Sequence, residues 1–448
     1  MKFYSYILLF ILAPFVLSAQ NNHQQFESID SVSHGSFNPN EAHSFHEWFK
    51  KGHVSGLFRS NFISTYRPES QHFSGAAGLG GRIYYHSAYW HGFQIGIGGI
   101  YTYNILSTDL SNTTESFYLP KWERQLFDLE DPDNKHDLDR LEELFIKYRH
   151  KDSYVKIGKM LLNTPLVNPQ DSRMKPSAFQ GIWIDWNEGH RFEINGGFFN
   201  KVSPRSTTEW IEISESINLY DHLLDPDSSH YVMDTKGLLI AGGHYIPNEK
   251  ISFHSWQYLI ENISFITFNQ IEYQESKVKL GLQYYFQNAV NENHYLDQDH
   301  IAHKISGQIK WTEDKWQLSY NQTANLSDYA MKFPSEWGAE PFYTFISRHR
   351  IMGLEQINSR ALKLDIQPFN NWESLNIGLY GVHSSFSQSK ASNSMTQLSL
   401  DIQTHFKGNW KALKLRFLNS YFITDGFSEN DFLYESIYHS QLILNYRF

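Results

Sequence analysis

The chain has 448 residues and a formal net charge of −10, from 38 Lys and Arg against 48 Asp and Glu. It contains no cysteine, which excludes disulfides, thiolate metal ligands and a lipid-modified N-terminal cysteine. The acidic balance leaves no basic footprint for nucleic acid. Aromatic residues make up 16% of the chain, although its mean hydropathy is −0.49. These properties fit a secreted β-protein or an outer-membrane barrel, whose strands are only weakly hydrophobic on average.

The first residues, MKFYSYILLFILAPFVLSAQ, have the layout of a secretory signal peptide. The apolar run from Ile7 to Leu17 is shorter than the roughly 20 residues of a membrane-spanning helix. We therefore expect a signal peptide over residues 1–19, cleaved after Ala19. Residues 20–50, which include NEAHSFHEWFKK, show no alternation and are expected to form a periplasmic segment with a short helix.

From residue 51 to residue 448 apolar and polar residues alternate in segments of strand length, which predicts a β-structure. Eighteen such segments follow one another: 53–66, 78–89, 93–103, 141–149, 153–160, 181–186, 191–200, 235–246, 251–259, 265–274, 277–286, 301–311, 316–326, 359–369, 374–384, 396–406, 413–422 and 438–448.

The connections between these segments differ in length. Every second one is short and polar, such as HKD or PNEK, and most of the others are longer. This asymmetry is typical of a transmembrane antiparallel β-barrel whose two termini face the periplasm. A soluble protein of several β-sandwich domains would not be expected to keep short and long connections in phase. We therefore predict an all-β barrel of about 18 strands over residues 51–448, in the bacterial outer membrane.

The last segment places Leu442, Leu444, Tyr446 and Phe448 on one face. A final strand that ends on Phe resembles the C-terminal signature of outer-membrane proteins. We expect Tyr446 and Phe448 to form the signal that the barrel-assembly machinery reads.

The stretch NTPLVNPQDSRMKPSAFQG, residues 163–181, follows a strand that rises from a tight turn, so it lies on the outer side. Eighteen strands enclose a lumen too wide for wall side chains alone to fill. Three prolines stiffen the loop. We expect it to fold into the lumen and to place Asp171, Arg173 and Lys175 at a constriction, although a solvated surface loop is the alternative.

The polar face of each strand indicates the charge of the lumen. Fourteen bases and five acids fall on these faces, although the whole chain is acidic. A basic wall concentrates anions in the pore. Seven bases lie away from the turns and form the expected lumen wall: Arg59, Arg82, Lys279, Lys304, Lys363, Lys414 and Arg416.

Other chemical sites are weakly supported by the sequence. The acidic segment 127–143 lacks the spacing of a calcium loop and is expected to be a solvated loop. No metal-binding spacing occurs among the histidines, so we expect neither metal nor cofactor. His383 with Ser384 leaves open an outer-membrane hydrolase, but nothing marks the surroundings of a nucleophile.

Two stretches resemble the OprD family of outer-membrane porins. GKMLLNTPLVNPQDSRMKPSAFQG is similar to the family's third loop, and PSEWGAEPFYTFISRHRIMG, residues 334–353, to a later extracellular loop. Met174-Lys175-Pro176 departs from the common Leu-Leu-Pro or Leu-Pro. The second stretch carries an Arg-x-Arg pair, and we place its Arg348 and Arg350 at the constriction.

The resemblance implies a passive channel that prefers certain small water-soluble compounds, many bearing a carboxylate, and that has no enzymatic activity. With the basic wall it predicts selective diffusion of small anionic solutes. Its expected partners are outer-membrane lipid and lipopolysaccharide, the solutes and the assembly machinery, and we expect a monomer or loose trimer. The alternatives are a barrel enzyme and an adhesion or receptor barrel.

Overall fold

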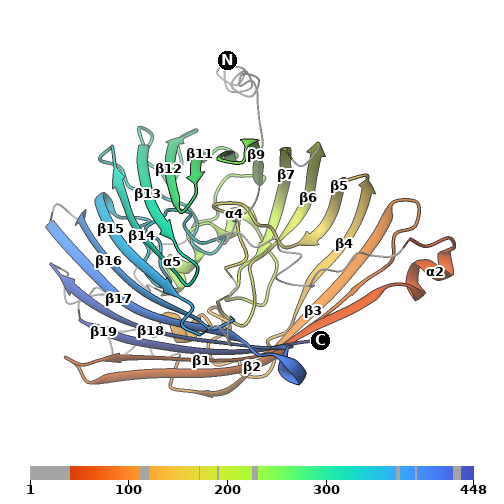
Figure 1. Cartoon of the computed structure of the whole chain (residues 1–448), viewed down its shortest axis with the longest axis horizontal. Coiled ribbons are helices and arrows are strands. Elements are labelled where there is room, and N and C mark those ends of the chain that lie inside the picture. The colour runs from red at the N-terminus through yellow and green to blue at the C-terminus, as the bar shows by residue number, and fades with distance from the viewer. Residues whose placement is uncertain are drawn as a thin grey trace.

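A computed structural model describes residues 41–110, 121–170, 172–188, 191–224, 231–369, 374–388, 391–426 and 435–448. Within these ranges the chain forms one antiparallel sheet that closes on itself, because β1 pairs with β19. Eighteen long strands make the ring, and the two-residue β8 pairs with β7 beside it. Figure 1 looks into this ring from one end of the barrel.

The strands follow the chain in order around the ring. Their bounds are β1 His53–Arg67, β2 His72–His86, β3 Phe93–Ser107, β4 Arg140–His150, β5 Ser153–Met160, β6 Ala178–Glu188, β7 Phe192–Ser203, β8 Ile211–Glu212, β9 Leu238–Asn248, β10 Ile251–Ile260, β11 Ser264–Glu275, β12 Val278–Ala289, β13 Ile301–Thr312, β14 Trp316–Asn325, β15 Glu355–Ile366, β16 Asn376–Gln388, β17 Ala391–His405, β18 Leu413–Asp425 and β19 Ile437–Arg447. The helices are α2 Phe45–Lys50, α3 Lys121–Arg124, α4 Ile213–Ser216, α5 Leu219–Leu224 and the 3-10 turn η3 Gly408–Trp410.

Each of the eighteen predicted segments coincides with one long strand, so the prediction of an antiparallel barrel of about 18 strands is confirmed. The bounds of β5 are those predicted from the sequence, whereas β2 begins at His72, six residues before the predicted start at Gly78. No helix in the described part of the chain is long and apolar enough to cross a membrane.

The alternation of each strand separates two environments. On β1 the side chains of Phe58 and Phe62 are exposed on the outside, whereas Arg59 and Asn61 are buried on the inside. On β19 the outward Leu444 is exposed, whereas the inward His439 and Gln441 are buried. The apolar outer face is the one that contacts lipid in a membrane barrel.

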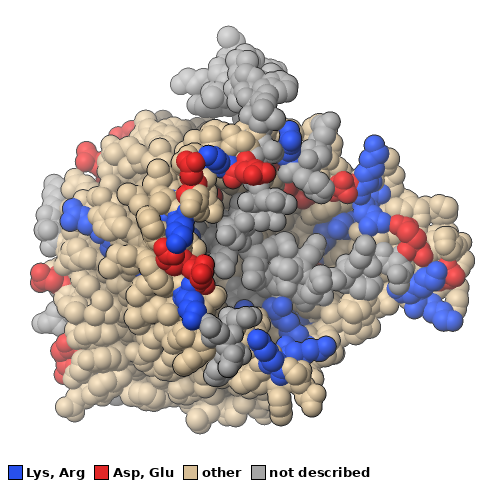
Figure 2. All heavy atoms as spheres, in the orientation of Figure 1, with Lys and Arg blue, Asp and Glu red and all other residues tan. Residues whose placement is uncertain are grey.

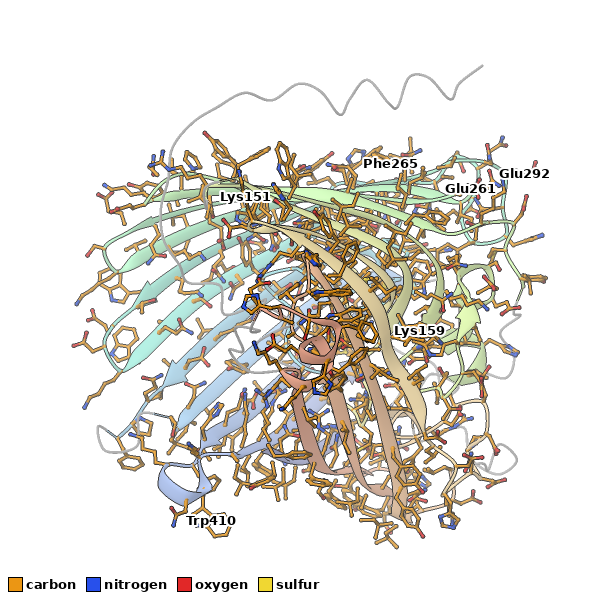
Figure 3. The ribbon with its side chains drawn as sticks, turned by 90° about the vertical axis from the view of Figure 1, so that its right-hand side faces the viewer. Lys151, Lys159, Glu261, Phe265, Glu292 and Trp410 are labelled. Atoms are coloured by element: carbon orange, nitrogen blue, oxygen red, sulfur yellow. The ribbon has the colours of Figure 1, made fainter. Side chains whose placement is uncertain are left out.

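The two ends of the barrel differ in their connections. The tight turns that contain Lys151 and Trp410 lie at one end, and the connections that contain Glu261 and Glu292 lie at the other (Figure 3). The far end carries the long segments 108–139, 161–177, 204–237 and 326–354, but also the short connections 68–71 and 261–263. Figure 2 looks onto the turn end, where Lys and Arg lie among Asp and Glu. Ion pairs such as Lys250–Glu275, 2.5 Å, account for part of this mixture.

The described parts of these long segments fold inward, and a packed apolar core fills part of the barrel. Leu166 and Met174 from one loop and Trp337 from another are buried in a single cluster with strand residues such as Phe179. The expectation of a solvated loop over residues 127–143 holds for residues 130–137, which are exposed or half-buried, but is wrong for residues 127–129 and for Leu138. Phe127, Leu129 and Leu138 belong to or border this core and are at most 1% exposed, because the apolar residues between the acids turn inward.

The segment before β1 contains α2, whose start is capped by the Ser44 side chain accepting a hydrogen bond from the Glu47 main-chain nitrogen. The expected signal peptide 1–19 and residues 20–40 lie outside the described residues, so these boundaries stay predictions.

Candidate functional site

A cavity of about 760 Å³ lies between the inward-folded segments and the barrel wall. Residues from the connections 161–177, 204–237 and 326–354 line it, together with α3 and strands β16, β17 and β18. The cavity therefore occupies the space that the long connections leave open inside the barrel.

The lining is strongly basic. Asp221 is the sole carboxylate among the lining residues that the structure describes. The bases that line the cavity are Lys121, Arg173, Arg205, Lys332, Arg348, Arg350 and Arg416. Four of these, Arg173, Arg348, Arg350 and Arg416, are the residues that the sequence indicated, and the fold brings them together from two loops and β18.

Arg173 lies in the loop between β5 and β6 and is 1% exposed. Its Nη2 donates to Oε1 of Gln125, 2.7 Å away, in the segment after α3. Burial, then the nearby Arg348 and Arg205, lower the pKa of the Arg173 guanidinium well below its ordinary value. Like charges held this close create a positive potential that favours an anion.

Arg348 is held in a strained conformation between β14 and β15. Its φ of 81° lies in the left-handed region, which costs a non-glycine residue about 1–3 kcal/mol. Its Nη2 donates to Oε1 of Gln441 at 2.5 Å, and its Nε donates to Nε2 of His439 at 2.9 Å. Burial, then Arg205 and Arg416, lower the pKa of Arg348 to about 9, so it is a cation at neutral pH.

Aromatic rings accompany the arginines. The Arg348 guanidinium carbon lies 5.9 Å from the centre of the Trp122 ring. Trp122 in turn stacks on Phe422, with ring centroids 5.5 Å apart. Phe345 and Phe386 also line the cavity. The site thus combines cationic donors with flat apolar surfaces.

The wall bases hold the inward-folded segments. Two wall arginines donate to main-chain oxygens of the loop between β5 and β6. Arg59 Nη1 donates to the oxygen of Arg173 at 2.7 Å, and Arg82 Nη2 donates to the oxygen of Met174 at 3.3 Å. The loop between β14 and β15 is held in the same way by three further bases. Lys304 Nζ lies 3.3 Å from the Ile351 oxygen, Lys363 Nζ 2.8 Å from the Phe345 oxygen, and Arg416 Nη2 2.9 Å from Ser347 Oγ.

Carboxylates neutralise two wall bases. Arg416 pairs with Asp401 at 2.6 Å, and Lys279 pairs with Glu272 at 2.9 Å. Lys414 lies on β18 on the same side as Arg416.

One loop residue that the sequence placed at the constriction lies elsewhere. Lys175 does not line the cavity, because its side chain is fully buried beside Arg140 and its Nζ has no hydrogen-bond partner in the described part of the chain. Burial, then Arg140, lower the pKa of Lys175 to about 7. Asp171 lies outside the described residues.

Three of the lining bases escaped the sequence analysis: Lys121, Arg205 and Lys332. Arg205 follows Pro204 in the outer connection after β7, just as Arg173 lies in a proline-bearing outer connection after β5. A proline-bearing outer connection with an arginine is the signal that would have found it.

The enzyme alternative gains no support from the geometry. Nδ1 of His383 lies 2.9 Å from Oγ1 of Thr396 rather than beside Ser384. Ser384 contacts His349 at 2.7 Å and donates to Ser359 at 2.8 Å, both inside the protein. No group of three His, Asp or Glu side chains in the described ranges is arranged to hold a metal ion.

A closed antiparallel barrel with an apolar exterior and a polar, partly filled interior is the architecture of an outer-membrane β-barrel protein. The family model for the outer membrane porin, OprD family, matches residues 49–343. The chain therefore belongs to the OprD family. The match ends inside the second of the two stretches that resemble this family.

Solved structures of similar fold cover most of the chain. OpdO of Pseudomonas aeruginosa matches with a TM-score of 0.72 and 15% identity over 91% of this chain and 99% of its own. OpdK of the same organism, crystallised with vanillate, matches with a TM-score of 0.71 and 14% identity, over 90% of this chain and 99% of its own. OccAB4 of Acinetobacter baumannii matches with a TM-score of 0.70 and 15% identity, over 89% of this chain and 98% of its own. No curated protein sequence matches this chain.

Proposed function

We propose that this porin passes small anionic solutes, in particular carboxylates that carry a flat or apolar body, by passive diffusion. The observation that supports this most strongly is the cavity whose described lining has seven bases and one carboxylate, Asp221. In a cavity with low-dielectric walls such a surplus raises the local concentration of anions.

The loop arginines, rather than the wall bases, carry the selectivity. Several wall bases donate to loop oxygens or pair with carboxylates, as Lys363 and Lys279 do. Arg173, Arg205, Arg348 and Arg350 line the cavity together, and a planar guanidinium suits a carboxylate with two parallel hydrogen bonds.

The loop from Asn163 to Gly181 narrows the passage in this proposal. Its main chain is held from the wall by Arg59 and Arg82, and its Ser177 Oγ donates to the main-chain oxygen of Glu336 at 2.8 Å. The two inward segments thus support each other across the lumen, which favours a fixed constriction over a freely moving lid.

The aromatic surfaces beside Arg348 extend the proposal to the body of the solute. Trp122 and Phe422 stack on each other next to this guanidinium. A ring that bears a carboxylate has both groups that such a site recognises. The related OpdK was crystallised with vanillate, an aromatic carboxylate, and this agrees with the proposed class.

The proposal includes no catalysis, since the family consists of channels and the His383 pair is not assembled. The reading of Tyr446 and Phe448 by the assembly machinery and the state as monomer or loose trimer stay predictions.

Block of ionic current by benzoate tests the proposal, with uncharged benzamide as the matched probe. The protein is placed in a planar bilayer, and the residual current is measured against the concentration of each compound. We expect benzoate to reduce the current at concentrations where benzamide does not. Equal effects of the two compounds would contradict a carboxylate site.

A further inference from the structure

The short helix α2 lies against the outside of the barrel wall. Trp48 Nε1 donates to the Phe93 main-chain oxygen at 3.1 Å, and the Tyr85 hydroxyl donates to the Phe49 oxygen at 2.7 Å. Tyr85 shares its strand face with the exposed Ile83, and Phe93 is 45% exposed, so both belong to the outward face. Figure 1 shows α2 outside the ring of strands.

The helix is amphipathic, and its apolar face is open. Phe45 is 58% exposed and Phe49 40% exposed. The Phe45 ring lies 5.8 Å from Trp48, 5.2 Å from Phe49 and 5.7 Å from Trp90, which extends the apolar face onto the turn between β2 and β3. These four side chains, Phe45, Trp48, Phe49 and Trp90, form what we call the aromatic patch.

The opposite face is polar and holds the helix in shape. It carries His46, Glu47, Lys50 and Lys51, and Lys51 pairs with Glu47 at 2.9 Å. The chain before the helix is fixed as well, because the main-chain nitrogen of Ala42 donates to the Tyr89 oxygen at 2.7 Å. The aromatic patch is therefore presented on a support that is already folded.

We propose that α2 is an interfacial anchor, whose aromatic patch inserts between the phospholipids of the leaflet at the turn end of the barrel. The patch continues the outer aromatic surface of the barrel. Trp48 of the patch contacts Phe93, whose ring centre lies 4.9 Å from that of Tyr148 on the lipid-facing side. Trp and Phe concentrate at this depth, where an aromatic ring meets headgroups. Lys50 and Lys51 lie on the polar face, where phosphate groups would meet them.

A lipid surface explains the patch better than a second copy of the chain. A stable protein interface buries about 1,200–2,000 Å² in total, which a helix of six residues and one turn do not offer. A membrane needs no complementary shape, and the barrel wall already brings the patch to its surface.

The absence of cysteine from the sequence makes a clean test possible. Single cysteines are introduced by Phe45→Cys on the aromatic patch and by Lys50→Cys on the polar face, and each is labelled with an environment-sensitive fluorophore. Ile97→Cys, on the lipid-facing side of β3, and Lys411→Cys, in the turn after β17, give the membrane and water references. The full-length proteins are folded into phosphatidylethanolamine–phosphatidylglycerol vesicles with or without brominated acyl chains.

We expect the label at position 45 to shift to the blue and to lose fluorescence in brominated vesicles, as the label at 97 does. The label at 50 should behave like the one at 411. Quenching at 45 no stronger than at 411, in protein whose heat-modifiable mobility shows a folded barrel, would overturn the proposal. A blue shift of the label at position 45 that appears only at a high protein-to-lipid ratio would also overturn the proposal, because it would show that a second copy of the chain covers the patch.

Discussion

The guanidinium of Arg59 on β1 donates from Nη1 to the main-chain oxygen of Arg173, 2.7 Å away in the loop between β5 and β6. Arg59 is 5% exposed, and its Nε also donates to Asn445 on the neighbouring strand at 2.8 Å. One wall base thus joins the seam at which the barrel closes to the loop that carries a cavity arginine. The wall positions the loop, and the loop presents charge to the cavity.

Removal of this contact is expected to loosen the loop. Arg59→Met leaves the Arg173 oxygen without its charged donor, which costs about 1.5–3 kcal/mol for a buried hydrogen bond of this kind. The loop then fluctuates, and we expect noisier open-channel current in a planar bilayer. Arg360→Met, at an exposed position of β15, is the control and should leave the current noise unchanged. Equal noise in the two variants would show that Arg59 does not hold the loop.

Close approach of the loop to the wall gives a second prediction. A methyl group added to Gly78 would lie 2.9 Å from Sδ of Met174 in the same loop. Gly78→Ala should therefore push the Met174 side chain aside and change the single-channel conductance, at a cost of up to about 1–3 kcal/mol for overpacking. Gly307→Ala adds the same group where nothing lies within 4 Å. A conductance that changes equally in both variants would contradict a loop packed against β2.

Arg348 is expected to dominate binding of carboxylates. Arg348→Gln removes a cation that faces the cavity, and the loss of about 1.5–3 kcal/mol predicts roughly 10- to 150-fold weaker block by benzoate. Arg348→Lys keeps the charge but not the planar guanidinium that can form two parallel hydrogen bonds with a carboxylate, so block of intermediate strength is expected. Both variants are compared with the unaltered protein by the benzoate concentration that halves the current. Unchanged block in Arg348→Gln would move the binding site elsewhere.

The buried Lys175 predicts a pH-dependent gain of stability on its removal. Its pKa falls from an ordinary 10.5 to about 7 through burial and Arg140, against the opposing influence of Asp128, Glu142 and Asp139. The unfolded chain therefore binds the proton more tightly than the folded one, so folding carries a penalty that is absent above the unfolded pKa and complete below about pH 7.

Lys175→Met should thus raise the temperature of unfolding in detergent more at pH 6 than at pH 10. The measurement is the loss of heat-modifiable mobility at each pH. Lys411→Met, at an exposed turn, is the control and should show no such difference. A gain that does not vary with pH would mean that folding does not lower the pKa of Lys175.

The sequence was sufficient to predict the strands because a period of two is a local property. Every segment of alternating residues became a strand, and the connections at the turn end, such as that at Lys151, were short enough to bound them. The ends of the strands on the side of the long connections were less predictable. β2 begins at His72, because this strand continues past the alternating stretch to pair with β1 up to Arg67.

The cavity was predictable only in part. Arg173 was found because its loop is stiff, charged and placed at the outer end of a wide lumen, and Arg348 because its loop resembles that of a family. The contact between Arg59 and Arg173 joins residues that no local pattern relates. Lys175 illustrates the limit most directly. Its neighbour Arg173 lines the cavity, and only the path of the backbone decides that Lys175 points into the core instead.

Ion selectivity tests the central claim most directly. The purified protein is placed in a planar bilayer with a potassium chloride gradient, and the potential at zero current is measured. The basic cavity predicts a reversal potential that favours chloride, and the preference should fall in Arg348→Gln. A reversal potential that favours potassium in the unaltered protein would contradict an anion-selective pore.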